Sequence, residues 1–101
     1  MKTFELEVAW DPAKAQANVA KHGVSFLQAS TVLLDPLAIS AFDEAHSGTE
    51  DRWFTLGSSQ DGKLLAVAHT YRTIDDTRAQ ARIISARPAT RLEREQYQNP
   101  K

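Results

Sequence analysis

The chain of 101 residues contains no cysteine, which excludes a disulfide framework, a thiolate metal site and a cysteine nucleophile. No run of apolar residues approaches the roughly 18 that a membrane span requires. Glu5 and Glu7 interrupt the amino-terminal stretch, where a signal peptide would need an unbroken apolar segment. We therefore expect a cytoplasmic protein with no membrane partner.

Arginine is absent from residues 1–51, and all seven arginines lie between Arg52 and Arg94. Residues 1–51 carry three positive and eight negative charges, a net −5, whereas residues 52–101 carry nine and five, a net +4. The guanidinium group contacts phosphate through a planar fork of donors and stays charged at physiological pH. This asymmetry indicates a nucleic-acid or other charged partner. The alternative is a salt-bridged soluble surface, in which paired charges contribute little.

Glycine and proline are scarce, with four of each, and no linker, repeat or low-complexity tract divides the chain. Hydrophobic residues make up 42% of the sequence and charged residues 25%, as in ordinary globular proteins. The length suits one core and leaves no room for a second. We expect a single domain over residues 1–101.

A strand followed by a helix is predicted near the amino terminus. Apolar and polar residues alternate over residues 4–8, which is the period of a half-buried strand. Asp11 can cap a helix that begins at Pro12, and Gly23 can close it; the predicted helix spans residues 12–22. We expect an apolar stripe of Ala13, Ala17, Ala20 and Val24 on this helix and a polar stripe of Lys14, Asn18 and Lys21.

Two further helices are predicted from capping boxes, one at Ser25 and Gln28 and one at Thr90 and Glu93. The first should stop at Asp35-Pro36, because the residue before proline is pushed out of helical conformation. Asp61-Gly62 has the signature of a hairpin turn. We expect strands over residues 37–42, 52–56, 64–72 and 78–86, a loop over 43–51 and a last helix over 91–98.

Together these elements predict an α+β fold. A short first strand and two helices precede a curved antiparallel sheet, a short carboxy-terminal helix follows, and the helices lie on one side of the sheet. Alternation along the last strand puts Arg82 and Ala86 on one face and Ile83 on the other.

Short motifs follow one another in a fixed order along almost the whole chain. They are Trp10-Asp11-Pro12-x-Lys14, Asn18-x-x-Lys21-His22-Gly23-Val24-Ser25-Phe26, Asp35-Pro36, Arg52-Trp53, Leu56-Gly57, His69-Thr70-x-Arg72 and Arg82-Ile83-Ile84-Ser85-Ala86-Arg87-x-Ala89-Thr90-x-x-Glu93, with Tyr97 near the end. Their order and spacing resemble the BrnT family of bacterial toxins. Pro88 departs from the pattern, because many relatives are expected to carry a basic residue there, and this departure weakens any assignment of position 88 to RNA contact.

The resemblance implies a RelE-like fold and a ribonuclease that inhibits translation by cutting RNA. It also implies a partner, a BrnA-like ribbon-helix-helix antitoxin that neutralises the toxin. Operator DNA would be bound only through that antitoxin. The resemblance is also compatible with a dimer of the toxin within the toxin–antitoxin complex.

The residues themselves favour cleavage without a metal or other cofactor, because carboxylates and histidines do not cluster at ligand spacing. Such a ribonuclease uses the 2′-hydroxyl of RNA as nucleophile and needs a base, a cation for the crowded phosphate and an acid. The candidate catalytic residues are His22, His69, Arg82, Arg87 and Tyr97, and the candidate RNA-binding residues are Lys21, Arg52 and Arg72.

Several alternatives remain open at this point. His22 could merely favour the end of its helix, His69 could be a hydrogen-bonded core residue, and Arg52 could pair with Glu50 or Asp51. Lys21 could lie on a solvated helix face or contact the antitoxin. The chain could also be a non-catalytic co-repressor that acts with its antitoxin. A free-standing nucleic-acid-binding domain is disfavoured by the pI near 6.3, whereas the acidic first half suits a basic partner.

Overall fold

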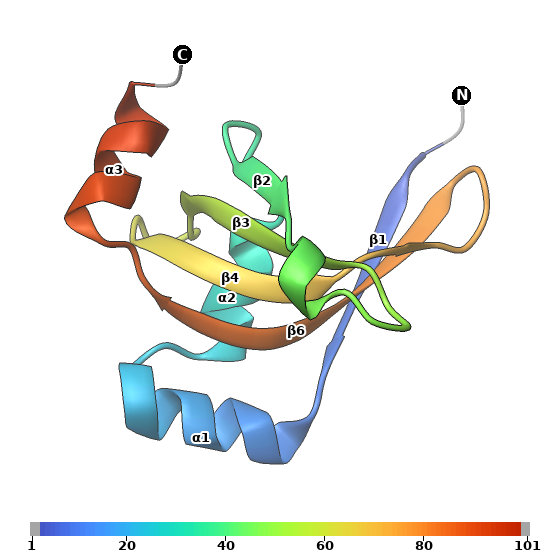
Figure 1. Cartoon of the computed structure of the whole chain (residues 1–101), viewed down its shortest axis with the longest axis horizontal. Helices are drawn as coiled ribbons and strands as arrows, with labels where there is room; N and C mark the ends of the chain where they lie inside the picture. The colour runs from blue at the N-terminus through green and yellow to red at the C-terminus, as the bar shows by residue number, and fades with distance from the viewer. Residues whose placement is uncertain (1–2, 100–101) are drawn as a thin grey trace.

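The computed structural model describes residues 3–99 as an α+β fold built on one curved sheet (Figure 1). Within this range, no helix is long and apolar enough to cross a membrane. In chain order the elements are β1 (Glu5–Trp10), α1 (Pro12–His22), α2 (Phe26–Val32), β2 (Ile39–Phe42), the 3-10 helix η1 (Glu44–His46), β3 (Arg52–Ser58), β4 (Leu64–Thr70), β5 (Arg72–Thr73), β6 (Arg78–Pro88) and α3 (Arg91–Gln98).

The helix boundaries follow from local hydrogen bonds that the sequence predicts. Asp11 accepts a hydrogen bond from the N–H of Ala13 at 3.1 Å, and Gly23 closes α1 with φ of 68°, a conformation that costs glycine little. Both predicted capping boxes are present, at the starts of α2 and α3. The bounds predicted for α1 and α3 are thereby confirmed.

The sheet has the strand order β1-β6-β4-β3-β2, and β5 pairs with β6. Strand β1 runs parallel to β6 along its whole length, so the sheet is mixed, and the prediction of an antiparallel sheet is wrong for this strand. The other pairs are antiparallel. No hairpin turn follows β1; instead the chain enters α1 and α2, and apolar alternation alone does not reveal the direction of a strand's partner.

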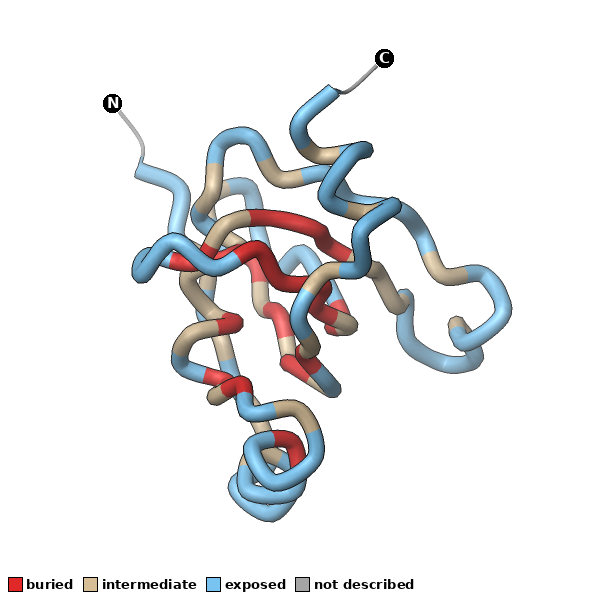
Figure 2. The backbone as a smooth tube through the Cα atoms, turned by 90° about the vertical axis from the view of Figure 1, so that its left-hand side faces the viewer, coloured by how far each residue is buried: buried red, intermediate tan, exposed pale blue. Residues whose placement is uncertain are grey.

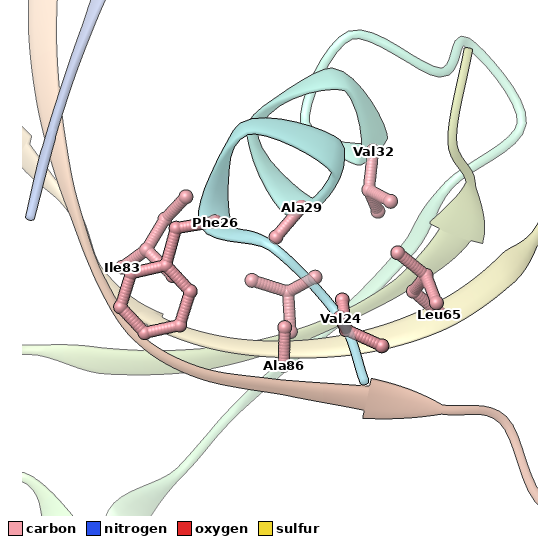
Figure 3. Packing of buried hydrophobic residues seen from close by; sticks show 8 residues of the cluster. Val24, Phe26, Ala29, Val32, Leu65, Ile83 and Ala86 are labelled. Atoms are coloured by element: carbon pink, nitrogen blue, oxygen red, sulfur yellow. The ribbon is translucent and has the colours of Figure 1, made fainter. Parts of the chain in front are cut away.

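Helices cover both faces of the sheet, which corrects the expectation that they share one side. Leu65 and Val67 face α2 and pack with Phe26, Ala29 and other residues of the main core (Figure 3). Leu64 and Ala66 alternate with them and pack with Tyr97 of α3 in a second, smaller cluster. Buried residues are concentrated in the middle of the fold, on β4, β6 and α2, whereas most residues of the connecting segments are exposed (Figure 2).

The buried face of α1 is not the predicted alanine stripe. Ala13, Ala17 and Ala20 are exposed, whereas Asn18 is 6% exposed. The Asn18 amide donates to Val24 O at 2.9 Å and Ala86 O at 2.8 Å, and its oxygen accepts from Ala86 N at 3.1 Å. Strand β1 ends opposite Ile83, so the Asn18 side chain satisfies the backbone of β6 beyond the end of that pairing. A buried amide is stable here because its polar atoms are bonded.

Alternation along β6 is broken where its register with β4 shifts, between Ala68 and His69. Ile83 and Ala86 therefore both belong to the main core, although the sequence predicts opposite faces for them. Arg82 lies beside Ala9 of β1, and Arg87 lies beside Ala66. A β-bulge changes which side chains share a face, and this one brings both arginines to the face opposite α1 and α2.

Candidate functional site

The sequence-predicted residues lie in several separate places on the fold. Arg52, Arg72 and Arg82 gather near one end of the sheet. Arg87 is bonded to Glu93 of α3, Tyr97 belongs to that helix, and His69 is in the core. His22 and Lys21 end helix α1. The structure thus brings three of the four predicted arginines together, without joining them to either predicted histidine.

A cavity of about 460 Å³ lies where β6, β5 and the loop before β3 meet, and Arg72 and Arg82 line it. Tyr71 and Trp53 contribute aromatic surface to its wall. Arg72 donates through Nη2 to Gln80 Oε1 at 3.0 Å. Cationic forks beside aromatic rings suit a nucleic-acid backbone and its bases.

Arg82 donates through Nη1 and Nη2 to the two oxygens of Glu50, both at 2.9 Å. This bidentate hydrogen bond holds the pKa of Glu50 below its ordinary value, and the positive charges of Arg52 and Arg72 lower that pKa further. The same bond raises the pKa of Arg82. The wall of the cavity therefore carries two arginines, Arg72 and Arg82, and two acidic residues, Glu50 and Asp51.

Arg87 makes a second bidentate pair, with Glu93 of α3, at 2.7 Å and 3.0 Å. Its guanidinium carbon also lies 5.3 Å from the centre of the Phe54 ring, a cation–π contact. The hydrogen bonds from Arg87 lower the pKa of Glu93 to about 2. Glu93 completes the capping box of α3 as well, so Arg87 anchors the start of that helix.

Tyr97 donates its hydroxyl proton to Asp35 Oδ2 at 2.5 Å. This bond raises the pKa of Tyr97. Partial burial raises the pKa of Asp35, but hydrogen bonds from Ser58 N, Tyr97 and Leu37 N lower it on balance. The pair ties α3 to the turn after α2.

His69 is 5% exposed, and both of its ring nitrogens are bonded. Nδ1 lies 2.8 Å from Thr70 O and Nε2 lies 2.7 Å from Thr55 Oγ1. Burial lowers the pKa of His69, although the bond to Thr70 opposes this. Because a carbonyl only accepts, Nδ1 carries the proton of the neutral ring and Nε2 accepts from Thr55. This placement favours the alternative of a core histidine.

His22 is half-buried at the end of α1 and lines a separate cavity of about 330 Å³ with Lys63 and Arg94. Lys21 is exposed on the same turn. Pro88, which departs from the family pattern in the sequence, also lines this second cavity. His22 therefore shares a small basic recess with these residues, away from the cavity lined by Arg82.

Two acidic partners of the arginines were not among the predicted site residues. The sequence suggests Glu50 as a partner for Arg52, but the structure pairs it with Arg82, 32 residues away. For Glu93 the sequence predicts only a place in a capping box. A capping pattern is visible in sequence because its residues are adjacent, whereas a long-range ion pair leaves no such pattern.

Within residues 3–99, no group of three or more His, Asp or Glu side chains is placed to hold a metal ion. Cleavage of RNA without a metal ion stays a prediction.

Comparisons with known proteins agree on one family. The family model described as "Ribonuclease toxin, BrnT, of type II toxin-antitoxin system" matches residues 10–93. The fold is similar to that of the ribonuclease toxin BrnT from Brucella abortus, known from a crystal structure at 1.1 Å resolution. The match has a TM-score of 0.59 and 25% sequence identity, and it covers 86% of this chain and 100% of that one. No match is found among curated proteins. The chain belongs to the BrnT family of ribonuclease toxins of type II toxin–antitoxin systems, whose members act with an antitoxin partner.

Proposed function

We propose that this chain is a RelE-like endoribonuclease that cleaves RNA without a metal ion, acts in the cytoplasm and inhibits translation. A BrnA-like ribbon-helix-helix antitoxin would neutralise it and carry the complex to operator DNA. The observation that carries the proposal is the cavity lined by Arg72 and Arg82, with the charge of Arg52 acting on the Glu50 carboxylate of the same wall.

The chemistry assigned to Arg82 is stabilisation of the phosphate under attack. The adjacent 2′-hydroxyl gives its proton to a base and attacks phosphorus, and negative charge builds on the phosphate oxygens. The bond from phosphorus to the 5′-oxygen then breaks, and that oxygen takes a proton from an acid and leaves as a hydroxyl, with a cyclic phosphate on the other product. A fixed guanidinium fork stabilises that charge more in the transition state than in the ground state. Arg72 and Arg52 would hold neighbouring phosphates of the same strand.

His69 is proposed to position Arg82, since its ring has no contact with the cavity that would let it carry protons. Its Nδ1 bonds Thr70 O, and Thr70 Oγ1 accepts from the backbone N–H of Arg82 at 3.0 Å. His22 and Tyr97 do not line this cavity either, so proton transfer at a phosphate bound to Arg82 falls to a group outside the predicted catalytic residues. Arg87 would act by fixing the helix that carries Tyr97.

Expression of the chain alone and together with its antitoxin tests the proposed function. We expect growth arrest and RNA degradation without the antitoxin, and normal growth with it. Normal growth and intact transcripts in cells that contain folded toxin would contradict the proposal.

A second candidate function, a non-catalytic co-repressor, is favoured by one observation: Arg82 and Arg87 are both already paired with glutamates. Under this alternative the folded chain would leave RNA intact and still strengthen operator binding by the antitoxin.

A further inference from the structure

Glu50 occupies the cationic cavity from a loop, and its contact with Arg82 is an exposed one. The side chains of Arg82 and Glu50 are 41% and 48% exposed. Among residues 3–99, Arg82 is the only residue that donates a hydrogen bond to the Glu50 carboxylate. An ion pair in water is weak, because solvent competes for both charges and salt screens them.

At this position the Glu50 carboxylate resembles a phosphodiester in its negative charge and in its two acceptor oxygens. Its two oxygens take both arms of the Arg82 fork at 2.9 Å, which is the geometry in which guanidinium binds a phosphate. The positive charges of Arg52 and Arg72 also attract this carboxylate. With the nearby Arg52, three arginines face two acidic residues, Glu50 and Asp51, so displacement of Glu50 leaves a net positive charge for an anion.

The loop that carries Glu50 is held on both sides by contacts that do not involve Glu50. On one side, Ser47 Oγ donates to Asp43 O at 2.7 Å and accepts from Arg52 N at 3.0 Å. On the other side, Tyr71 N donates to Asp51 O at 3.2 Å. Glu50 can therefore leave Arg82 without releasing β3.

We propose that this cavity binds one phosphodiester of single-stranded RNA on Arg82, and that Glu50 is an internal competitor which RNA must displace. The inference takes its ligand, RNA, from the proposed function. It adds that the protein's own Glu50 restrains binding at this site. Tyr71 and Trp53 lie on the cavity wall and offer stacking surface for the base beside this phosphate.

The test compares Glu50→Gln with the matched control Glu44→Gln, which removes the same charge from an exposed residue of the same loop. The probe is a short single-stranded RNA with 2′-O-methyl riboses, which binds but cannot be cleaved. At low salt, Glu50→Gln should bind this probe about tenfold more tightly than the wild type, and Glu44→Gln by less than about twofold. Thermal unfolding checks that each variant is folded.

Arg82→Ala in the Glu50→Gln background should abolish the gain, because the competitor and the ligand use the same fork. Equal affinities for Glu50→Gln and Glu44→Gln would overturn the inference. So would a Glu50→Gln variant that binds the probe as the wild type does but no longer cleaves natural RNA, since Glu50 would then serve the chemistry.

The outcomes also separate this inference from the proposed function. Tighter binding by Glu50→Gln, together with no cleavage by any variant, would reject the ribonuclease and retain the competitor. Cleavage by the wild type with unchanged binding in Glu50→Gln would retain the ribonuclease and reject the competitor. Absence of binding by all variants would reject both.

Discussion

Arg82 is the residue on which the proposed chemistry depends most. Its backbone N–H donates to Thr70 Oγ1, and its side chain lines the cavity, where it donates to the Glu50 carboxylate. Few side chains other than arginine could span two phosphate oxygens in this way, because lysine offers a single point charge.

Arg82→Ala should slow RNA cleavage by about 10²–10³, or roughly 3–4 kcal/mol of transition-state stabilisation, the usual effect of losing one electrostatic donor. Arg82→Lys should remain impaired. The matched control is Arg78→Ala, which removes an exposed arginine of the same strand that pairs with Asp75. Single-turnover cleavage rates check this, and equal rates for the two alanine variants would contradict it.

At the residue scale, the sequence predicts a catalytic role for Arg82, leaves His69 open between a proton carrier and a core residue, and wrongly places Asn18 on a polar surface stripe. Arg82 is conspicuous because charge among apolar strand residues is costly without an anion. Asn18 has the polarity of a surface residue, and only its three bonds to Val24 and Ala86 explain its burial. Two of these bonds go to Ala86, 68 residues away in sequence, so no local pattern could indicate them.

At the scale of elements, two polar contacts attach α3 to the rest of the fold. Arg87 bonds Glu93 near the start of the helix, and Tyr97 bonds Asp35 near its end. No residue of α3 within the described range is buried, so apolar packing alone holds it weakly. The position of Tyr97 thus depends on these contacts.

Glu93→Gln should loosen α3 and cost about 1.5–3 kcal/mol at neutral pH, since it removes charge-assisted hydrogen bonds. The folded-state pKa of Glu93 is about 2, below its ordinary 4.5. Its stabilising contribution is therefore complete above pH 4.5 and is lost as the pH falls toward 2.

Chemical unfolding across pH and hydrogen exchange of the α3 amides check this prediction. The control is Glu95→Gln on the same helix, whose carboxylate is exposed and 3.7 Å from Arg91. If the stabilities of the two variants agree at neutral pH, the anchoring role of Glu93 is contradicted.

The elements themselves were largely predictable, whereas their pairing was not. Asp11, Gly23 and the two capping boxes determine helix ends through contacts between neighbours in sequence. The parallel pairing of β1 with β6 and the irregularity near Ala68 arise from contacts between distant segments. For that reason the shared face of Arg82 and Arg87 appears only in the structure.

At the scale of the whole molecule, charge is divided between the two halves of the chain. The net −5 of residues 1–51 suits a basic antitoxin surface, and the net +4 of residues 52–101 suits RNA. Glu50 lies at the boundary and brings the acidic half into the basic site. The two ligands of the proposed toxin would therefore be attracted to different parts of one small domain.

Cleavage of RNA by the purified chain in excess chelator tests the central claim most directly. The account predicts that cleavage persists, that the products carry cyclic-phosphate or 3′-phosphate ends, and that DNA, which lacks the 2′-hydroxyl, stays intact. Folded protein that leaves RNA uncut, or cleavage that chelator abolishes and a divalent ion restores, would contradict the account.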